Sequence, residues 1–210
     1  MRVKIFLQRH GQSVGNAEGL YLGHTDLGLT EEGREQARIT AEHLSDEEID
    51  VIYSSDLKRA YETAIPHAVL RNLEVKNSKN LREIFVGDWE GMRVPELKRE
   101  HYEEFVIRRT YRNFVYPNGE STYHAAERMK AELLKICGEN PDKTLLVVSH
   151  SAVIRAFWYY LSGYTEENMT DRVKFMPNCA YCILTYEDGK LIPETYGISG
   201  HLPETNVHPV

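Results

Sequence analysis

An Arg-His-Gly sequence, Arg9-His10-Gly11, follows closely on an apolar strand pattern formed by Val3, Ile5 and Leu7. The alternation of this run is typical of a buried strand, so the histidine is held rigidly where the strand opens into a turn. The neighbouring guanidinium supplies a fixed cation that suits phosphate or carboxylate. The pattern favours His10 as a nucleophile toward phosphoryl groups. The alternative is a histidine that merely ends a strand.

Two other polar positions also follow expected strands. Arg59 lies about one turn into the helix after the second strand, and His150 follows the most continuous apolar run, residues 144–149. Because ligands of parallel sheets bind at the carboxyl ends of strands, we expect Arg59 and His150 to converge on His10. Arginines bind phosphate oxygens bidentately, and their charge favours the neutral imidazole that can attack phosphorus. His150 would donate to the phosphoryl oxygens in the transition state, with the Ser151 N–H as a further donor.

Glu83 is the candidate proton donor for the leaving alkoxide. It lies in an irregular stretch, residues 81–91, that contains two glycines and is typical of a functional loop. A carboxylic acid there could protonate the leaving group and later accept a proton from the incoming water. Burial or a bound phosphate dianion would raise its pKa for this role. Glu90 in the same stretch is the competing carboxylate.

This scheme needs neither a metal ion nor a cofactor, because arginines carry the charge that a metal ion would otherwise neutralise. The chain has three cysteines, an odd number that does not indicate a disulfide framework. Cys179 and Cys182 form a CxxC pair in a strand-like run, where residues three apart point to opposite faces. We therefore expect no metal or redox site at this pair.

The elements that must position these residues alternate between strands and helices, which predicts an α/β three-layer sandwich with a mostly parallel central sheet flanked by helices. We expect one domain over residues 1–210, with residues 11–28 as a loop. The expected strands are 4–8, 51–54, 73–75 and 144–149, with an edge hairpin of 180–186 and 190–192, and the expected helices are 29–44, 57–70, 95–109, 121–138 and 152–161.

The net charge of −7 argues against nucleic acid or an anionic membrane surface as a partner, since both require a basic face. No apolar run approaches the length needed to span a bilayer, and the basic N-terminus leads into a strand instead of a secretory signal. We expect a cytoplasmic protein. Any anion site must be a local exception, built from a few arginines against an unfavourable overall field.

Six blocks of residues occur in a characteristic order: Leu7-Gln8-Arg9-His10-Gly11; Leu29-Thr30 with Gly33 and Gln36-Ala37; Ser54-Ser55-Asp56-Leu57 with Arg59-Ala60 and Thr63-Ala64; Leu81-Arg82-Glu83 with Gly87 and Trp89-Glu90-Gly91; Gly119-Glu120-Ser121; and Val147-Val148-Ser149-His150. Together they resemble the histidine phosphatase superfamily, in its phosphoglycerate mutase-like branch. The resemblance implies an α/β sandwich and assigns roles as follows: His10 as phosphorylated nucleophile, Arg9, Arg59 and His150 as phosphate pocket, Glu83 as proton donor, and Asn16 as a phosphate or substrate contact.

Several positions depart from the family pattern or leave two interpretations open. Gln12 stands where the family often has glutamate, which makes the site more favourable to anions. Ser151 replaces the usual glycine after the second histidine, and its side chain could narrow the pocket. His24 could line the substrate mouth or be exposed. Arg108 and Arg109 end a helix, as is typical of a solvated face; contact with a substrate carboxylate is the alternative.

The sequence thus predicts a metal-independent phosphatase of the histidine acid phosphatase type, acting on small phosphorylated metabolites through a phosphohistidine on His10. One alternative is a phosphoglycerate mutase dependent on 2,3-bisphosphoglycerate, and another is a non-catalytic phosphate-binding protein. Mutases of the family tend to carry a longer insertion where 27 residues separate Gly91 from Gly119 here. A short lid leaves the phosphohistidine open to water and favours hydrolysis. We expect a monomer or a homodimer.

Overall fold

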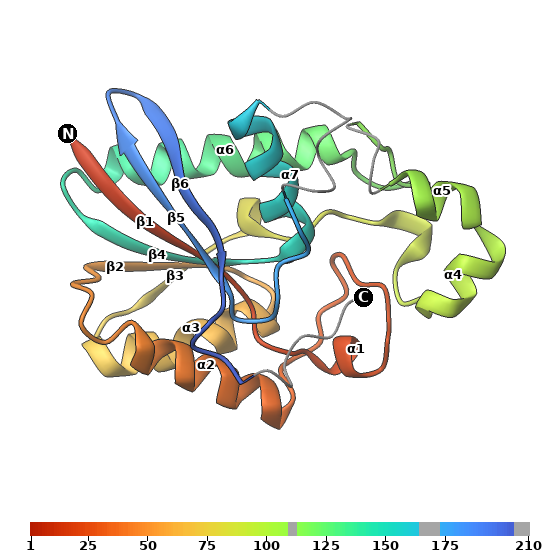
Figure 1. Ribbon diagram of the computed structural model, residues 1–210, viewed down its shortest axis with the longest axis horizontal. Helices are drawn as coiled ribbons and strands as arrows, with labels where there is room; N and C mark the ends of the chain where they lie inside the picture. Colours follow the sequence, from red (N-terminus) through yellow and green to blue (C-terminus); the bar gives the residue numbers. More distant parts are fainter. Residues whose placement is uncertain (109–112, 164–172, 204–210) are drawn as a thin grey trace.

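A computed structural model describes residues 1–108, 113–163 and 173–203. At its centre lies a six-stranded sheet in the order β3-β2-β4-β1-β5-β6 (Figure 1). The strands are β1 (Arg2–Arg9), β2 (Val51–Ser55), β3 (Val75–Ser78), β4 (Thr144–Ser149), β5 (Tyr181–Glu187) and β6 (Lys190–Ile198).

The first four strands run parallel, and the last two form an antiparallel hairpin at one edge. β1 lies between β4 and β5, with Leu7 opposite both Val147 and Cys182. These central strands are buried on both faces, which matches their near-continuous apolar sequences. Because β1, β2 and β4 are parallel, their carboxyl ends lie next to one another at the same end of the sheet.

Helices cover both faces of the sheet, which confirms the expected three-layer α/β architecture (Figure 1). α2 (Glu31–His43) and α3 (Lys58–Arg71) cover one face, and α6 (Thr122–Glu139) and α7 (Ser151–Ser162) cover the other. The hydroxyls of Thr30 and Ser121 cap α2 and α6, each by accepting a backbone N–H of the first turn. Within the described residues, no helix is both long and apolar enough to cross a membrane.

The segment between β3 and α6 forms short elements instead of one long helix. These are η1 (Lys79–Leu81), η2 (Gly87–Trp89), α4 (Val94–Glu100) and α5 (Tyr102–Ile107). The prediction of a single helix over 95–109 was wrong, because His101 leaves the helical region with φ −134° and ψ 43°. Its ring packs against Trp89, with 5.8 Å between ring centroids.

Three further boundaries differ from expectation, and the first is that of β3, which spans Val75–Ser78 instead of 73–75. Residues 11–28 are not entirely a loop, since a capping box between Ser13 and Asn16 forms the one-turn α1 (Val14–Ala17). β6 continues to Ile198, well beyond the predicted end at residue 192. Pro193 interrupts the sequence pattern there, but an edge strand tolerates a proline.

Candidate active site

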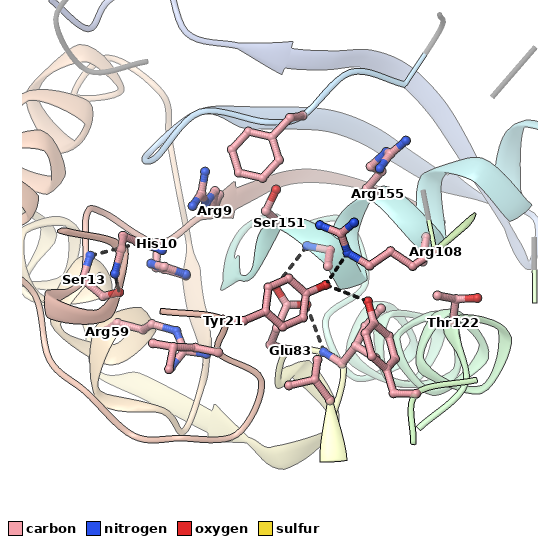
Figure 2. A pocket seen from close by; sticks show the side chains of 18 of the residues that line it. Arg9, His10, Ser13, Tyr21, Arg59, Glu83, Arg108, Thr122, Ser151 and Arg155 are labelled. Atoms are coloured by element: carbon pink, nitrogen blue, oxygen red, sulfur yellow. Dashed lines mark hydrogen bonds between the residues drawn. The ribbon is translucent and has the colours of Figure 1, made fainter. Parts of the chain in front are cut away.

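The carboxyl ends of β1, β2 and β4 open into one cavity, as the sequence predicted. Figure 2 shows Arg9, His10 and Arg59 on one side of this cavity, Glu83 and Ser151 toward its middle, and further arginines on the other side. The residues that line it are Arg9, His10, Ser13, Asn16, Leu20, Tyr21, Leu22, Arg59, Glu83, Ile84, Val86, Arg108, Tyr116, Thr122, Ser151, Ala152, Arg155, Ala156, Tyr159, Tyr160 and Phe175.

His10 is fixed in one tautomer by its neighbour. Its Nδ1 lies 2.6 Å from the carbonyl oxygen of Gly11, which can only accept a hydrogen bond. Nδ1 therefore carries the proton, and Nε2 keeps the lone pair needed for attack on phosphorus. Burial lowers the pKa of His10 well below its ordinary value, and the charges of Arg59 and Arg9 lower it further. The imidazole is neutral and nucleophilic at physiological pH.

The segment after α7 holds Arg9 beside His10. Arg9 donates a 2.6 Å hydrogen bond from Nη1 to the carbonyl of Met176, and its guanidinium lies over the ring of Phe175 at 4.7 Å. Burial lowers the pKa of Arg9 to about 10, with the charge of Glu83 acting in the opposite direction. The side chain therefore stays cationic at neutral pH.

Arg59 and His150 form a hydrogen-bonded pair. Arg59 is 1% exposed and donates from Nε to Nδ1 of His150 at 3.2 Å. Its terminal nitrogens donate to the carbonyls of Thr25 and Gly23 at 2.8 and 2.7 Å. Each terminal nitrogen retains a second hydrogen for a phosphate oxygen. Arg59 is thus a second rigidly held cation, after Arg9, in the wall of the cavity.

His150 uses both ring nitrogens within the protein. Because Arg59 donates to Nδ1, the proton lies on Nε2, which donates to the hydroxyl of Ser55 at 2.9 Å. Its ring centroid is 5.1 Å from that of His10. A hydrogen bond from His150 to a phosphoryl oxygen would therefore replace the one to Ser55.

Glu83 lies in the cavity, 7% exposed, and its carboxylate faces the start of α7. Oε1 accepts the backbone N–H groups of Ile84 and Val153, whereas Oε2 accepts that of Ala152 alone. Burial raises the pKa of Glu83 above its ordinary value, although these three N–H groups act in the opposite direction. Oε2, with fewer partners, is the oxygen with room for a transferable proton.

Glu90, the competing carboxylate, is occupied by hydrogen bonds that hold the neighbouring loop. It accepts the backbone N–H groups of Gly23, His24 and Thr25 and the Thr25 hydroxyl, at 3.2, 2.6, 3.1 and 2.6 Å respectively. Burial opposes ionisation, but these hydrogen bonds prevail and hold the pKa of Glu90 below its usual range. Glu90 therefore stays ionised and does not line the cavity.

Of the three remaining predicted substrate contacts, two line the cavity and one does not. Asn16 lines the cavity, and its Oδ1 accepts from Ser13 and Asn178, which leaves its amide nitrogen for a ligand. Ser151 also lines the cavity, and its buried hydroxyl has no hydrogen-bond partner among the described residues. His24 is not among the lining residues; its Nε2 bonds the carbonyl oxygen of Glu83 at 3.0 Å.

Sequence reasoning missed several supporting residues. Ser55 accepts from His150, and Thr63 accepts the backbone N–H of Gly11 at 2.9 Å. The amide of Asn178 donates to the carbonyl of His10 at 3.2 Å. Thr63 follows Arg59 by four residues, a helical spacing that places both on one face of α3, whereas Asn178 carries no such signal.

Arg108 is the clearest departure from expectation. The prediction of a solvated helix end was wrong for this residue, which is 8% exposed and lines the cavity. Its Nε donates to the Tyr21 hydroxyl at 3.0 Å, and its guanidinium lies 3.3 Å from the ring centroid of Phe105. Arg109 lies outside the described residues.

No group of three or more His, Cys, Asp or Glu side chains suited to a metal ion occurs in the part of the chain that the structure describes. Cys179 and Cys182 are buried free thiols, so they form no disulfide. Cys179 precedes β5 with φ +57°, so the argument that the two cysteines point to opposite faces of one strand does not apply to it. Its backbone N–H donates to the carbonyl of His10 at 3.2 Å, which helps to hold the end of β1.

Comparisons with known proteins find relatives and solved structures that match most of the chain. Phosphoserine phosphatase 1 of Hydrogenobacter thermophilus is 35% identical, over 96% of this chain and 95% of that protein. Phosphoglycerate mutase-like protein 4 of Arabidopsis thaliana is 34% identical, over 96% of this chain and 88% of that protein. The structure of a mycobacterial glucosyl-3-phosphoglycerate phosphatase superposes with a TM-score of 0.85 at 25% identity, covering 95% of this chain and 100% of that one.

A family model described as the histidine phosphatase superfamily (branch 1) matches residues 5–199, which include every site residue above. The resemblance inferred from the six sequence blocks is thereby confirmed. The chain belongs to the histidine phosphatase superfamily.

Proposed function

We propose that this protein is a metal-independent phosphatase that hydrolyses small phosphomonoesters through a phosphohistidine on His10. One observation carries the proposal: the Gly11 carbonyl holds the proton on Nδ1 of His10, and so leaves a neutral Nε2 on a residue that lines one cavity with two buried arginines, Arg9 and Arg59. Relatives named as phosphatases of phosphoserine and of glucosyl-3-phosphoglycerate support a phosphoric monoester hydrolase.

The reaction then proceeds in two displacements. Nε2 of His10 attacks phosphorus while the bond from phosphorus to the ester oxygen breaks, and Glu83 gives its proton to the departing oxygen. In the second step the Glu83 carboxylate takes a proton from water, whose oxygen attacks phosphorus as the bond to Nε2 breaks. Inorganic phosphate leaves, and Glu83 is again protonated.

Arg9 and Arg59 supply the charge stabilisation in both steps. Each guanidinium is anchored by backbone carbonyls, so its orientation costs no reorganisation when charge builds on the phosphoryl oxygens. This permanent positive charge is the reason to propose catalysis without a metal ion. In the transition state, His150 donates its Nε2–H to a phosphoryl oxygen instead of to Ser55.

We further propose that the protein is an acid phosphatase in its pH preference, because Glu83 must begin each cycle protonated. Its raised pKa extends the protonated form toward neutrality, and the lowered pKa of His10 keeps the nucleophile neutral in mild acid. The chain would act as one domain in the cytoplasm, where its three buried thiols remain reduced. A monomer or a homodimer is compatible with this proposal.

The proposal is tested by release of inorganic phosphate from an aryl phosphate in the presence of a chelator. We expect turnover that the chelator does not change, and acid-labile phosphate incorporated into the wild-type protein. His10→Ala should abolish both turnover and incorporation. Loss of all activity on chelation would overturn the metal-free mechanism, and a label that persists in His10→Ala would move the nucleophile elsewhere.

Two further measurements, of phosphoglycerate isomerisation and of phosphate binding, separate the phosphatase from the two alternatives. Interconversion of 2- and 3-phosphoglycerate that depends on 2,3-bisphosphoglycerate would make the protein a mutase. Phosphate binding without turnover or labelling would make it a non-catalytic binding protein. We expect hydrolysis that is indifferent to the bisphosphate, because the 27 residues between Gly91 and Gly119 give a short covering segment.

A further inference from the structure

Ser151 brings a buried hydroxyl into the cavity at the start of α7. The residue is 6% exposed and lines the cavity, and Figure 2 shows its hydroxyl pointing away from Glu83. No hydrogen bond joins this hydroxyl to any described residue. The two-step reaction proposed above does not use it. Where the family usually has glycine, this chain therefore carries an additional polar group.

A buried hydroxyl without a partner needs an explanation. Burying a polar group without a hydrogen bond costs folding free energy, so nearly all buried polar groups in native proteins are paired. Two buried serines nearby follow this rule. Ser55 accepts a hydrogen bond from His150, and Ser149 donates to the carbonyl of Leu81 at 2.7 Å. The exception at Ser151 indicates that its partner is a group that enters the cavity.

Arg9 carries a second buried donor without a partner in the same cavity. Its Nη1 donates to the carbonyl of Met176 and so fixes the guanidinium, whereas its buried Nε has no hydrogen-bond partner among the described residues. An arginine N–H can only donate a hydrogen bond, and a serine hydroxyl is able to donate one. Two unsatisfied donors on the wall of one cavity suit an anion with several oxygens.

The start of α7 also favours an anion, but part of it is already in use. A helix N-terminus attracts negative charge through its free backbone N–H groups. At α7 the carboxylate of Glu83 accepts those of Ala152 and Val153. The Ser151 hydroxyl adds a donor at this helix end. Because it points away from Glu83, it is suited to a phosphoryl oxygen and not to the water that Glu83 activates (Figure 2).

We propose that the side-chain hydroxyl of Ser151 is a ligand of the phosphoryl group and donates a hydrogen bond to one of its oxygens. The inference rests on the proposed phosphatase function and adds a residue to its binding site. No covalent bond to Ser151 forms or breaks, so His10 remains the nucleophile. In the phosphate-free protein the same hydroxyl is unsatisfied. It therefore strengthens phosphate binding while it lowers the stability of the free protein.

Ser151→Ala separates these two effects, because they have opposite signs. We would measure the Kd of inorganic phosphate by isothermal titration calorimetry and the Tm of the phosphate-free protein, both at one pH. A hydrogen bond to a charged group corresponds to about 10- to 100-fold in Kd, and we expect the Kd of the variant to rise by that factor. Its Tm without phosphate should also rise, since the unsatisfied group is gone.

Ser149→Ala is the matched control. It removes a hydroxyl that is also buried, two residues earlier in the chain, but whose acceptor is the carbonyl of Leu81. This variant leaves that carbonyl without its partner, so it should lower Tm and leave the Kd of phosphate unchanged. If Ser151→Ala does not fold, Ser151→Gly, which introduces the residue usual in the family, carries the same binding test.

The outcomes separate this inference from the proposed function. An unchanged Kd of phosphate in a folded Ser151 variant, while the wild-type protein hydrolyses an aryl phosphate, would overturn the inference alone and leave the hydroxyl bonded to solvent. A raised Kd together with a lowered Tm in phosphate-free Ser151→Ala would assign the loss to a disturbed structure, and would overturn it as well. Failure of the wild-type protein to hydrolyse the aryl phosphate would overturn the phosphatase function itself.

Discussion

Nε of Arg59 donates a 3.2 Å hydrogen bond to Nδ1 of His150. An arginine nitrogen can only donate, so this contact places the imidazole proton of His150 on Nε2 and directs it to Ser55. Burial lowers the pKa of His150 well below its ordinary value, and the charge of Arg59 lowers it further. His150 is therefore a neutral, pre-oriented donor, and in the proposed reaction it turns from Ser55 to a phosphoryl oxygen.

This relationship predicts the effect of Ser55→Ala. The variant leaves the buried Nε2–H of His150 without an acceptor, which costs about 1–3 kcal/mol of folding stability. We expect kcat to fall as well, by about 10-fold, because the ring loses its fixed orientation. Chemical denaturation and steady-state kinetics measure the two effects.

Ser54→Ala is the matched control for this prediction. Ser54 is equally buried on β2, but its hydroxyl donates to the carbonyl of Ser55, whereas the hydrogen bonds of the His150 ring are with Arg59 and Ser55. We expect a stability loss with little change in kcat. Equal loss of kcat in the two variants would remove Ser55 from the positioning role.

The pH dependence of hydrolysis follows from His10 and Glu83. Glu83 must be protonated, so kcat/KM should fall as pH rises through its raised pKa. His10 must be neutral, so the acidic limb should appear only well below the ordinary histidine pKa. We expect a rate maximum on the acidic side of neutrality. A rate that still climbs above about pH 9 would contradict a carboxylic acid donor.

Glu83→Gln should reveal the proton donor through the leaving group. Alkyl phosphates need protonation of the departing oxygen, whereas aryl phosphates release a more stable oxyanion. We expect the variant to lose far more activity on an alkyl phosphate than on an aryl phosphate, and to lose the basic limb of the pH profile. The same loss on both substrates would exclude Glu83 as the donor.

Close backbone packing around His10 predicts the effect of Gly11→Ala. A Cβ atom on Gly11 would lie 2.4 Å from the carbonyl oxygen of Gly33 at the start of α2. Relief of this clash must move the carboxyl end of β1, where His10 lies. We expect the free energy of unfolding to fall by about 1–3 kcal/mol, and kcat to fall because His10 is displaced. Gly138→Ala is the control, since its Cβ would meet nothing within 4 Å and should stabilise α6 by about 0.5–1 kcal/mol.

The sequence sufficed to predict that His10, Arg59 and His150 come together at the carboxyl ends of the parallel strands. His10 and His150 directly follow strongly apolar strands, and parallel order brings those strand ends together. The residues that orient these side chains were not predictable in the same way. Arg59 is held by the carbonyls of Gly23 and Thr25, and a backbone carbonyl has no signature in the side-chain sequence.

The burial of Arg108 escaped prediction for a different reason. A helix end that carries arginines is usually solvated, but Arg108 is covered because Tyr21, far away in the sequence, packs on the same side as Phe105. Arg155 did carry a signal, since a spacing of four residues from Ser151 places it on the same face of α7. Such a spacing is informative only after one member of the pair has been located in the cavity.

Glu90 gives the last prediction, because its role differs from that of the nearby Glu83. Its ionised carboxylate holds the backbone of Gly23 and Thr25, whose carbonyls in turn anchor Arg59. In Glu90→Gln an amide NH₂ group replaces one acceptor oxygen and faces a backbone N–H, so two donors meet without an acceptor. The loop carbonyls that hold Arg59 should therefore become less fixed. We expect KM for the phosphomonoester to rise by about 10-fold while the basic limb of the pH profile stays in place. Steady-state kinetics across pH would measure both, with Glu35→Gln, at an exposed position of α2, as the neutral control. Disappearance of the basic limb in Glu90→Gln would instead make Glu90 the proton donor.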